Sequence, residues 1–240
     1  MSHNTDKWTE KEHLPQWDEE FYHIYTAKKY GKWLMLKTLR PELKGIEEYE
    51  KMLDKEFEVR YNLAHSNIVM INDLEEVPGI GRCIITDDVY GDSMAALIKD
   101  GKFTEENLKK ITVDLVNALD YIQSNHIVHH PIRPETIIFT ENVGNLKVID
   151  VGFDQKSHLT PASAAEDIEQ YGKVLQAALN SLPTKHPDLQ HVADKCKAHR
   201  YRDIQELRFA LSDRNSSRLY ILIISFLVIM IMLLLWIDLQ

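Results

Sequence analysis

Two apolar segments early in the chain flank a polar turn and predict a β-hairpin. The segments are FYHIYTAK and KWLMLKTL, and the sequence KKYGK between them places Gly31 in the turn. Two further strands and one helix are predicted before residue 90, at 67–73, 82–86 and 46–64. The first part of the chain is therefore expected to be mainly antiparallel sheet with one helix.

The second part of the chain carries helical periodicity. Between 104 and 124 the apolar residues recur at helical spacing, and Thr104 is placed to cap this helix. The remaining predicted elements are helices at 165–182, 189–198 and 201–213, and short strands at 137–139 and 146–149. Strands followed by helices predict an α+β fold of two lobes, and the cleft between two lobes is the default place for a ligand.

The predicted elements divide the chain into a polar N-terminal segment (1–15) and a bilobal domain (16–213). The small lobe, an antiparallel sheet plus one helix, covers about 16–89, and the larger, mainly helical lobe covers about 90–213. The net charge of -9 argues against nucleic-acid binding. The two cysteines lie far apart and predict neither a disulfide framework nor a metal pair.

The C-terminal segment 219–237 reads LYILIISFLVIMIMLLLWI and contains no charged residue. As a helix it would be roughly 28 Å long, about one hydrocarbon core, whereas a buried core helix would normally keep a polar stripe. It is therefore predicted to be a transmembrane tail anchor, joined to the domain by a short tether (214–218). Arg214 and Arg218 precede it, and the polar N-terminus lacks signal-peptide features, so we expect a single-pass membrane protein with its N-terminal domain in the cytoplasm.

Several separated segments resemble, in order, the motifs of the protein kinase superfamily. They are KWLMLKTL, KEFEVRYNLAHSNIV, CIITDDVYGDSMAALI, HHPIRPET, LKVIDVGF, EDIEQYGKVL and AHRYRDIQELRFAL. The resemblance covers about residues 16 to 212 and implies the bilobal protein-kinase-like fold, a small antiparallel-sheet lobe with one helix and a larger helical lobe. A shared fold does not imply a shared activity, so each site position has to be weighed separately.

The resemblance implies a nucleotide cleft between the lobes. It places Lys37 as the lysine that contacts the nucleotide phosphates and Glu56 as the ion-pair partner of that lysine. It places Thr86 at the gatekeeper position and Asp87 to Val89 in the hinge. These residues are the candidate cofactor site, expected to bind ATP or ADP weakly or as a vestige.

The metal and catalytic positions depart from the family. Asp150 matches the aspartate that holds magnesium, whereas Thr136 replaces the asparagine that binds a second ion and is a poorer ligand. Pro131 stands where the family has its catalytic aspartate, and its side chain cannot accept a proton. The segment between Asp150 and Asp167 is too short for the family's activation segment. The resemblance therefore implies no catalytic residue at the usual position.

Three histidines beside Pro131 offer other chemistry. His129 or His130 could act as a base, because a neutral imidazole titrates close to neutral pH. Together with His126 they also have a conceivable metal-ligand spacing. A structural role for these side chains is preferred, because the family's first histidine packs under this loop and no further ligand shell is evident.

The family's glycine-rich phosphate loop is missing. Counting back from the predicted strand, its three glycine positions are Trp17, Glu19 and Tyr22, and no glycine precedes Gly31. Glycine is needed there because backbone N–H groups must approach the phosphates closely. The acidic loop WDEEF would also place negative charge next to a triphosphate, so phosphates are expected to be poorly held.

Together these features predict a membrane-anchored pseudokinase that acts as a cytosolic binding, scaffold or regulatory module for unknown protein partners. Two alternatives stay open. One is an atypical active kinase or nucleotide transferase that uses Lys37 and Asp150 with ATP and magnesium; the other is a structural partner subunit that binds no nucleotide. Lys37, Glu56 and Asp150 accordingly form either a residual cofactor site or a polar cluster that fixes one lobe against the other.

Overall fold

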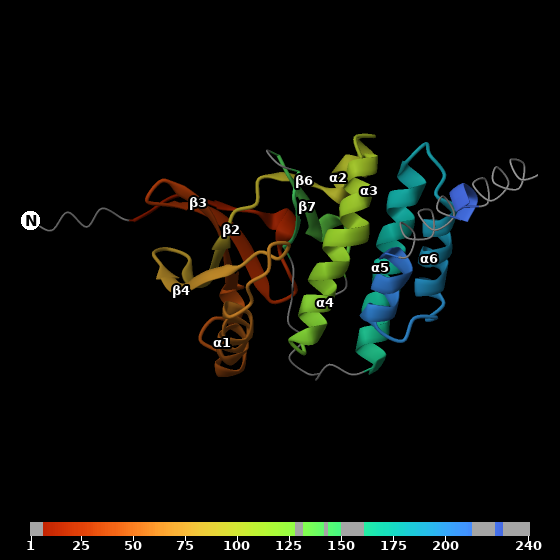
Figure 1. The fold of residues 1–240 in the computed structure, drawn as a ribbon. Helices are drawn as coiled ribbons and strands as arrows, with labels where there is room; N and C mark the ends of the chain where they lie inside the picture. The colour runs from red at the N-terminus through yellow and green to blue at the C-terminus, as the bar shows by residue number, and fades with distance from the viewer. Residues whose placement is uncertain (1–6, 128–131, 142–143, 150–160, 213–223, 228–240) are drawn as a thin grey trace, which may run out of the picture. The chain divides into compact units, whose positions relative to one another are not determined.

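The computed structural model describes residues 7–127, 132–141, 144–149, 161–212 and 224–227. The chain forms two compact units, Met1–Thr160 and Pro161–Gln240 (Figure 1). The first unit holds two antiparallel sheets and most of the helices, and the second is helical in its described part.

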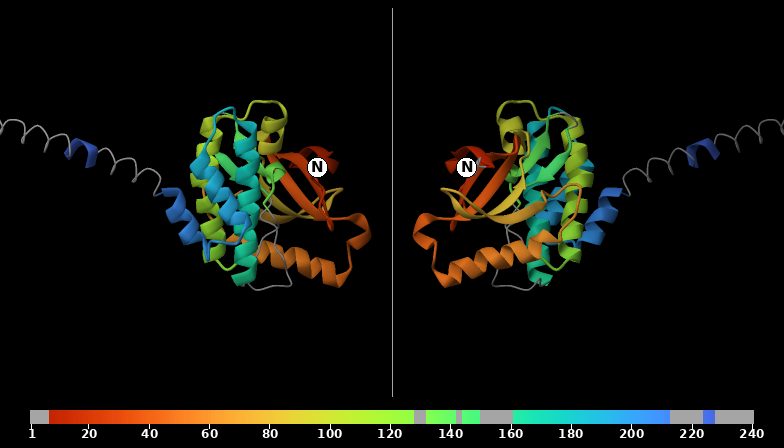
Figure 2. Two further views of the ribbon diagram at one scale, coloured as in Figure 1. Left: turned by 90° about the vertical axis from the view of Figure 1, so that its right-hand side faces the viewer. Right: turned by 90° about the vertical axis from the view of Figure 1, so that its left-hand side faces the viewer.

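A five-stranded antiparallel sheet with the order β1-β2-β3-β5-β4 forms the small lobe. Its strands are β1 (Trp8–His13), β2 (Tyr22–Lys29), β3 (Lys32–Leu39), β4 (Ile71–Val77) and β5 (Gly81–Asp87). Helix α1 (Glu47–Tyr61) runs below the strands and contacts β3 and β4 (Figure 2). Apolar side chains of the sheet and of α1 meet in a buried cluster that includes Leu39, Leu53 and Ile84.

The predicted hairpin is confirmed as β2 and β3. Lys29 pairs with Lys32, which leaves a two-residue turn of Tyr30 and Gly31. Both turn residues have positive φ, 51° and 85°, the backbone twist that a tight hairpin between right-twisted strands requires. The turn also fixes the register of β3 and hence the position of Lys37 opposite Ile24.

Strand β1 is an element that sequence reasoning did not anticipate. It pairs with β2 at the edge of the sheet, and a bulge between Thr9 and Glu12 interrupts the pairing. Its segment WTEKEH is mostly polar, as is common for an edge strand. Trp8, however, is only 1% exposed and packs in an apolar cluster with Leu34 and Leu36 of β3. The strand therefore holds the acidic segment 14–21 as a loop between β1 and β2.

The rest of the first unit contains a second, three-stranded sheet and a long helical segment. The sheet has the order β6 (Gly91–Ser93), β7 (Ile137–Thr140), β8 (Leu146–Val148). The helices are α2 (Met94–Lys99), α3 (Glu105–Lys110), a π-helical turn (Ile111–Leu115) and α4 (Val116–Ser124). Thr104 caps α3 as predicted, because its Oγ1 accepts a hydrogen bond from the Asn107 backbone N–H. Three 3₁₀ turns lie at Pro15–Trp17, Pro41–Leu43 and Pro134–Thr136.

The second unit contains α5 (Pro161–Ser181), α6 (Pro187–Lys197) and a helical stretch over 204–212. Helices α5 and α6 lie side by side (Figure 1). Gly172 marks their close approach, because a Cβ atom there would lie 2.6 Å from the Cβ of Cys196. The glycine in the middle of α5, normally a poor helix former, is therefore explained by packing.

The predicted C-terminal membrane anchor is wrong by this structure. In the part of the chain that the structure describes, no helix is both long and apolar enough to cross a bilayer. Of the predicted span 219–237 only 224–227 lies within the described residues, and these four residues are helical. The predicted membrane localisation with a cytoplasmic domain depended on this anchor and falls with it.

The substitution Trp8→Ala tests whether β1 belongs to the folded sheet. Removing a fully buried indole should lower the free energy of unfolding by about 3–5 kcal/mol, measured by urea denaturation. Thr9→Ala is the matched control, because Thr9 lies in the same strand but is exposed, and it should change stability by less than about 0.5 kcal/mol. Equal unfolding midpoints for Trp8→Ala and the wild type would show that β1 contributes nothing to the sheet.

Candidate functional site

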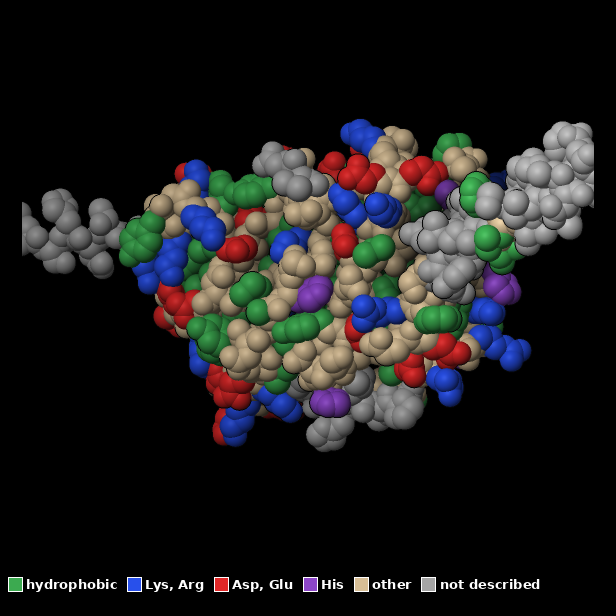
Figure 3. Space-filling view, in the orientation of Figure 1, with side chains coloured by type: hydrophobic (Ala, Val, Ile, Leu, Met, Phe, Trp, Pro, Cys, Tyr) green, Lys and Arg blue, Asp and Glu red, His purple; other side chains and the backbone are tan. Residues whose placement is uncertain are grey.

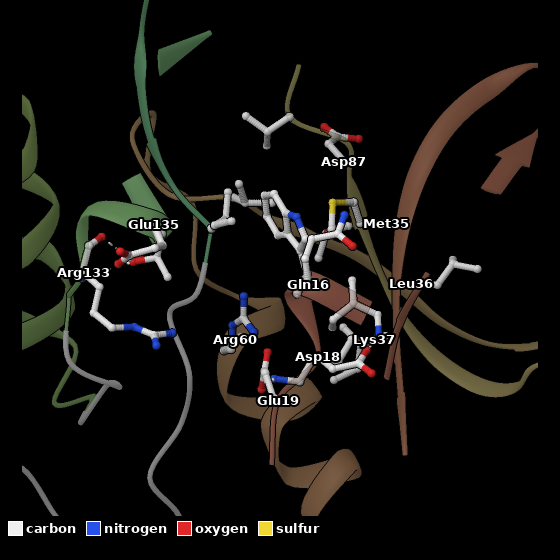
Figure 4. A pocket seen from close by; sticks show the side chains of 18 of the residues that line it. Gln16, Asp18, Glu19, Met35, Leu36, Lys37, Arg60, Asp87, Arg133 and Glu135 are labelled. Carbon is white, nitrogen blue, oxygen red and sulfur yellow. Dashed lines mark hydrogen bonds and ion pairs between the residues drawn. The ribbon is translucent and has the colours of Figure 1, made fainter. Parts of the chain in front are cut away.

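A cavity of about 500 Å³ lies between the five-stranded sheet, the β1–β2 loop and the segment around β7 and β8. Its walls include most of the predicted cofactor residues and the predicted second-metal position (Figure 4). These are Lys37, Thr86, Asp87, Val89 and Thr136. Glu56 reaches the same site through its contact with Lys37.

The centre of the site is a buried ion pair between β3 and α1. The Nζ atom of Lys37 lies 2.9 Å from Oε1 of Glu56, and both residues are buried. Burial alone would raise the pKa of Glu56, but the charges of Lys37 and then Arg60 outweigh it and hold the pKa below its usual range. The pair that the resemblance implies is thus formed, with Glu56 ionised.

Two further charged groups complete this cluster. Glu19, from the β1–β2 loop, places its Oε2 atom 2.5 Å from Lys37 Nζ, and Arg60 Nη1 lies 2.7 Å from Glu56 Oε1. The Lys37 ammonium also lies 4.3 Å from the ring centre of Tyr22. Two cations and two carboxylates therefore balance one another beside the cavity, and each ion keeps a partner of opposite charge.

Backbone contacts fix the loop that carries Glu19. Arg40 donates two hydrogen bonds to the Glu19 carbonyl oxygen, at 3.2 and 2.9 Å. The Glu19 N–H donates to the Tyr22 carbonyl at 3.0 Å, and the Ile24 N–H donates to Asp18 Oδ1 at 3.0 Å. The loop is therefore built around its own hydrogen bonds, and Glu19 is aimed at Lys37 rather than at solvent.

The hinge side of the cavity is polar and already engaged. Asp87, at the end of β5, accepts from Lys32 Nζ at 2.7 Å and from Asn72 Nδ2 at 2.8 Å. Burial would raise the pKa of Asp87, but these hydrogen bonds together with the charges of Lys32 and Lys147 hold the pKa below its usual range. Thr86 and Val89 are half-buried and line the same wall.

Thr136 is poorly placed to bind a metal ion. Its hydroxyl donates to the Arg133 carbonyl at 3.0 Å and accepts from the Arg133 N–H at 3.3 Å, closing a 3₁₀ turn. The hydroxyl therefore serves the local backbone. The other predicted metal and catalytic positions, Asp150 and Pro131, lie outside the described residues, as do His129 and His130.

Glu19 is the site residue whose role sequence reasoning missed. The sequence shows that the loop is acidic and contains no glycine, and its negative charge predicts repulsion of phosphates. The sequence does not predict that the same charge pairs with Lys37. The signal in the sequence is a β3 lysine with no glycine-rich loop before it. If phosphates are not held there, the lysine ammonium group has to pair with another anion.

The comparison with known families agrees with this architecture. The family model of the protein kinase domain matches residues 21–169, more than half of the chain. The chain belongs to the protein kinase family. In such kinases the loop between the first two strands covers the nucleotide phosphates and the β3 lysine contacts them. In this chain that loop is the acidic segment 14–21, and its Glu19 side chain accepts a hydrogen bond from the Lys37 ammonium group.

Curated relatives are serine/threonine kinases of greater length. Serine/threonine-protein kinase 36 of Pongo abelii is 30% identical over 135 residues, 55% of this chain and 10% of the relative. The Aurora kinase of Schizosaccharomyces pombe is 29% identical over 140 residues, 56% of this chain and 38% of the relative. The aligned part thus spans only a fraction of either relative.

Solved structures show the same fold. The kinase domain of Mycobacterium tuberculosis PknI has a TM-score of 0.58 at 20% identity, covering 84% of this chain and 94% of that chain. At this level of identity the likeness concerns the fold alone. It supports a bilobal kinase fold with a sheet lobe and a helical lobe.

The variant Glu56→Gln tests the buried cluster. Removing one partner of a buried ion pair should lower the free energy of unfolding at pH 7 by about 3 kcal/mol. Because the folded-state pKa of Glu56 is lowered from 4.5, its stabilisation is present above that value and is lost as the pH falls through the folded pKa. The deficit should therefore shrink in denaturant titrations below about pH 4.

Glu58→Gln is the control for this measurement, because Glu58 lies on the same helix but is exposed. It should leave stability within about 0.5 kcal/mol of the wild type at both pH values. A Glu56→Gln deficit that is the same at neutral and acidic pH would exclude the ion pair as its cause.

Proposed function

We propose that this chain is a kinase-family binding module that does not transfer phosphate and whose nucleotide cleft is closed by its own β1–β2 loop. The observation that carries the proposal is the 2.5 Å contact between Glu19 Oε2 and Lys37 Nζ. In an active kinase the corresponding lysine holds the nucleotide phosphates. In this chain a carboxylate of the protein takes the place of the phosphate charge.

Competition between Glu19 and a nucleotide favours the closed cleft. A group tethered by a short loop acts at an effective concentration of at least about millimolar. The hydrogen bonds from Arg40 to the Glu19 carbonyl reduce the freedom of the loop further. A triphosphate would also meet the carboxylates of Asp18 and Glu20 on the same loop, which line the cavity. ATP should therefore bind far more weakly than to a glycine-loop kinase.

The sequence of the catalytic segment points in the same direction. Pro131 at the position of the catalytic aspartate removes general-base assistance, which is worth about 10²–10⁴-fold in rate. The Thr136 hydroxyl, at the second metal position, is engaged with Arg133. With the cleft closed and the base missing, recognition of protein partners through the surface of the domain is the function that the kinase fold can still serve.

The surface of the small lobe fits protein contacts better than a polyanion. Acidic and basic side chains lie close together around its strands, with apolar side chains scattered among them (Figure 3). Ion pairs such as Lys28 with Glu10 and Lys7 with Glu75 neutralise charge locally. We expect isolation of complexes of the full chain to recover this protein partner.

One observation favours a second function, that of an active kinase. The Lys37–Glu56 pair has the geometry of a functional kinase cleft, which favours residual use of ATP with Asp150 as the magnesium ligand. That enzyme would transfer phosphate, and the substitution Asp150→Asn would abolish the transfer. Transfer that survives Asp150→Asn would argue against this rival.

The variant Glu19→Gln tests the closed cleft. The wild type should show no change in melting temperature with millimolar ATP and magnesium, whereas Glu19→Gln should bind ATP at least about tenfold more tightly, a gain of about 1.4 kcal/mol. Glu20→Gln is the matched comparison, because it removes a cavity-lining charge from the next residue of the loop but leaves the Glu19–Lys37 contact in place, so its gain in ATP affinity should be clearly smaller. Adding Lys37→Met to Glu19→Gln should abolish the response. Tight ATP binding by the wild type would overturn the proposal.

The variant Pro131→Asp tests whether one missing residue accounts for the expected inactivity. Supplying the base should not create phosphotransfer, since the loop would still present Glu19 to Lys37. Transfer of radiolabelled phosphate to a generic acceptor protein is the measurement, with Pro131→Asn as the control that adds no base. Activity in Pro131→Asp that is absent in the control would show that the cleft is open to nucleotide.

A further inference from the structure

A cluster of two histidines and one aspartate lies at the base of the acidic loop; Asp18 also borders the cavity, whereas neither histidine lines it. His13 ends β1, Asp18 belongs to the loop, and His23 lies near the start of β2. Their ligand atoms all lie within 4.8 Å of one another. Within the described residues no other group of three histidine, cysteine or acidic side chains comes together in this way.

We propose that His13, Asp18 and His23 bind a divalent transition-metal ion, with Zn²⁺ as the best match to the donor set. Imidazole nitrogen and carboxylate oxygen are ordinary zinc ligands, and three protein ligands leave a fourth position for water. The ligand atoms around a tetrahedral ion with bonds of about 2.1 Å are roughly 3.4 Å apart. The two histidine Nε2 atoms already lie 3.0 and 3.7 Å from the Asp18 carboxylate, and all the ligand atoms lie within 4.8 Å of one another. Shifts of at most about 1.4 Å therefore reach the tetrahedral spacing, and rotamer changes of partly exposed side chains can supply them.

The distances within the cluster fit the binding of a metal ion better than a simple histidine–aspartate salt bridge. His13 Nε2 lies 3.0 Å from both carboxylate oxygens of Asp18. His23 Nε2 lies 3.7 Å from Asp18 Oδ2, too far for a hydrogen bond. One histidine is enough to pair with one carboxylate, so the second imidazole facing the same oxygen is what a simple ion pair does not explain.

The orientation of the ligands is fixed by the surrounding sheet. The Ile24 N–H donates to Asp18 Oδ1 and so orients the carboxylate, whose Oδ2 lies near both histidines. Such an outer contact strengthens a metal ligand. The rings of His13 and His23 stack with centroids 4.6 Å apart and 29° between their planes.

The site is accessible without being fully open. The side chains of His13, His23 and Asp18 are 33%, 20% and 15% exposed. Water can therefore reach the fourth position, and an ion can enter without unfolding the sheet. The three ligands come from β1, the loop and β2, so one ion would tie both ends of the loop to its middle.

A bound ion would act on the cleft through Asp18, the neighbour of Glu19. Fixing Asp18 restricts the backbone that presents Glu19 to Lys37, so the ion would hold the loop in its closed position. This consequence rests on the proposed function, whereas binding of the ion does not. The ion would then act as a staple that strengthens the closure of the cleft.

Isothermal titration of the chelator-treated full chain with Zn²⁺ tests the site. The wild type should bind with a high-affinity site that His23→Gln and His13→Gln weaken at least about 100-fold, since loss of an outer-shell partner alone costs 10–100-fold. His191→Gln, an exposed histidine on α6, and a His129→Gln/His130→Gln double variant are the controls and should leave the site intact. Unchanged affinity in His23→Gln, loss of the site in either control, or no binding by the wild type would overturn the proposal.

Cobalt gives a second readout that does not depend on the variants' stability. Co²⁺ in the wild type should show the visible absorption of a tetrahedral site, and one equivalent of Zn²⁺ should displace it. Hydrogen exchange then tests the staple, with slower exchange in residues 14–24 when Zn²⁺ is present and no change in β4 and β5. If the chain binds zinc but Glu19→Gln shows no ATP response, the proposed function is wrong and the metal site stands. If Glu19→Gln responds to ATP but the chain does not bind zinc, only the metal site is wrong.

Discussion

The contact of Lys37 with two carboxylates is the constraint around which the small lobe is arranged. Lys37 lies on β3, Glu56 on α1 and Glu19 on the loop before β2, so one ammonium group joins three elements. Arg60 explains why one carboxylate is insufficient, because it adds a second buried cation beside Glu56. With Glu19 included the four charges sum to zero, and the cost of burying them is offset by pairing rather than by a bound phosphate.

The edge strand β1 makes this arrangement possible. A loop stays in place only if both of its ends are anchored, and Trp8 anchors one end in the apolar cluster of the sheet. The Ile24 N–H and the Arg40 guanidinium then fix the middle of the loop through Asp18 and the Glu19 carbonyl. The Glu19–Lys37 contact is thus a property of strand pairing and loop geometry together, and not of the acidic composition alone.

Elements with a local signal could be predicted from the sequence, and those that depend on distant contacts could not. The hairpin turn at Gly31 and the cap at Thr104 are encoded within a few residues, and both are present. Strand β1 has a polar sequence whose one buried side chain finds its partners far along the chain, so its pattern gave no signal. The apolar segment 219–237 shows the opposite error, since composition alone favoured a membrane helix that the described residues do not contain.

The same reasoning separates the two kinds of family feature in the cleft. A buried lysine–glutamate pair stabilises any domain that contains it, because loss of either partner leaves an uncompensated charge. A catalytic aspartate contributes to phosphate transfer and has no comparable packing role, so in the proposed binding module its loss would cost no buried ion pair. The Lys37–Glu56 pair is therefore weak support for phosphotransfer. The contact between Glu19 and Lys37 argues more directly against phosphotransfer, since a nucleotide phosphate would have to compete with this carboxylate for one ammonium group.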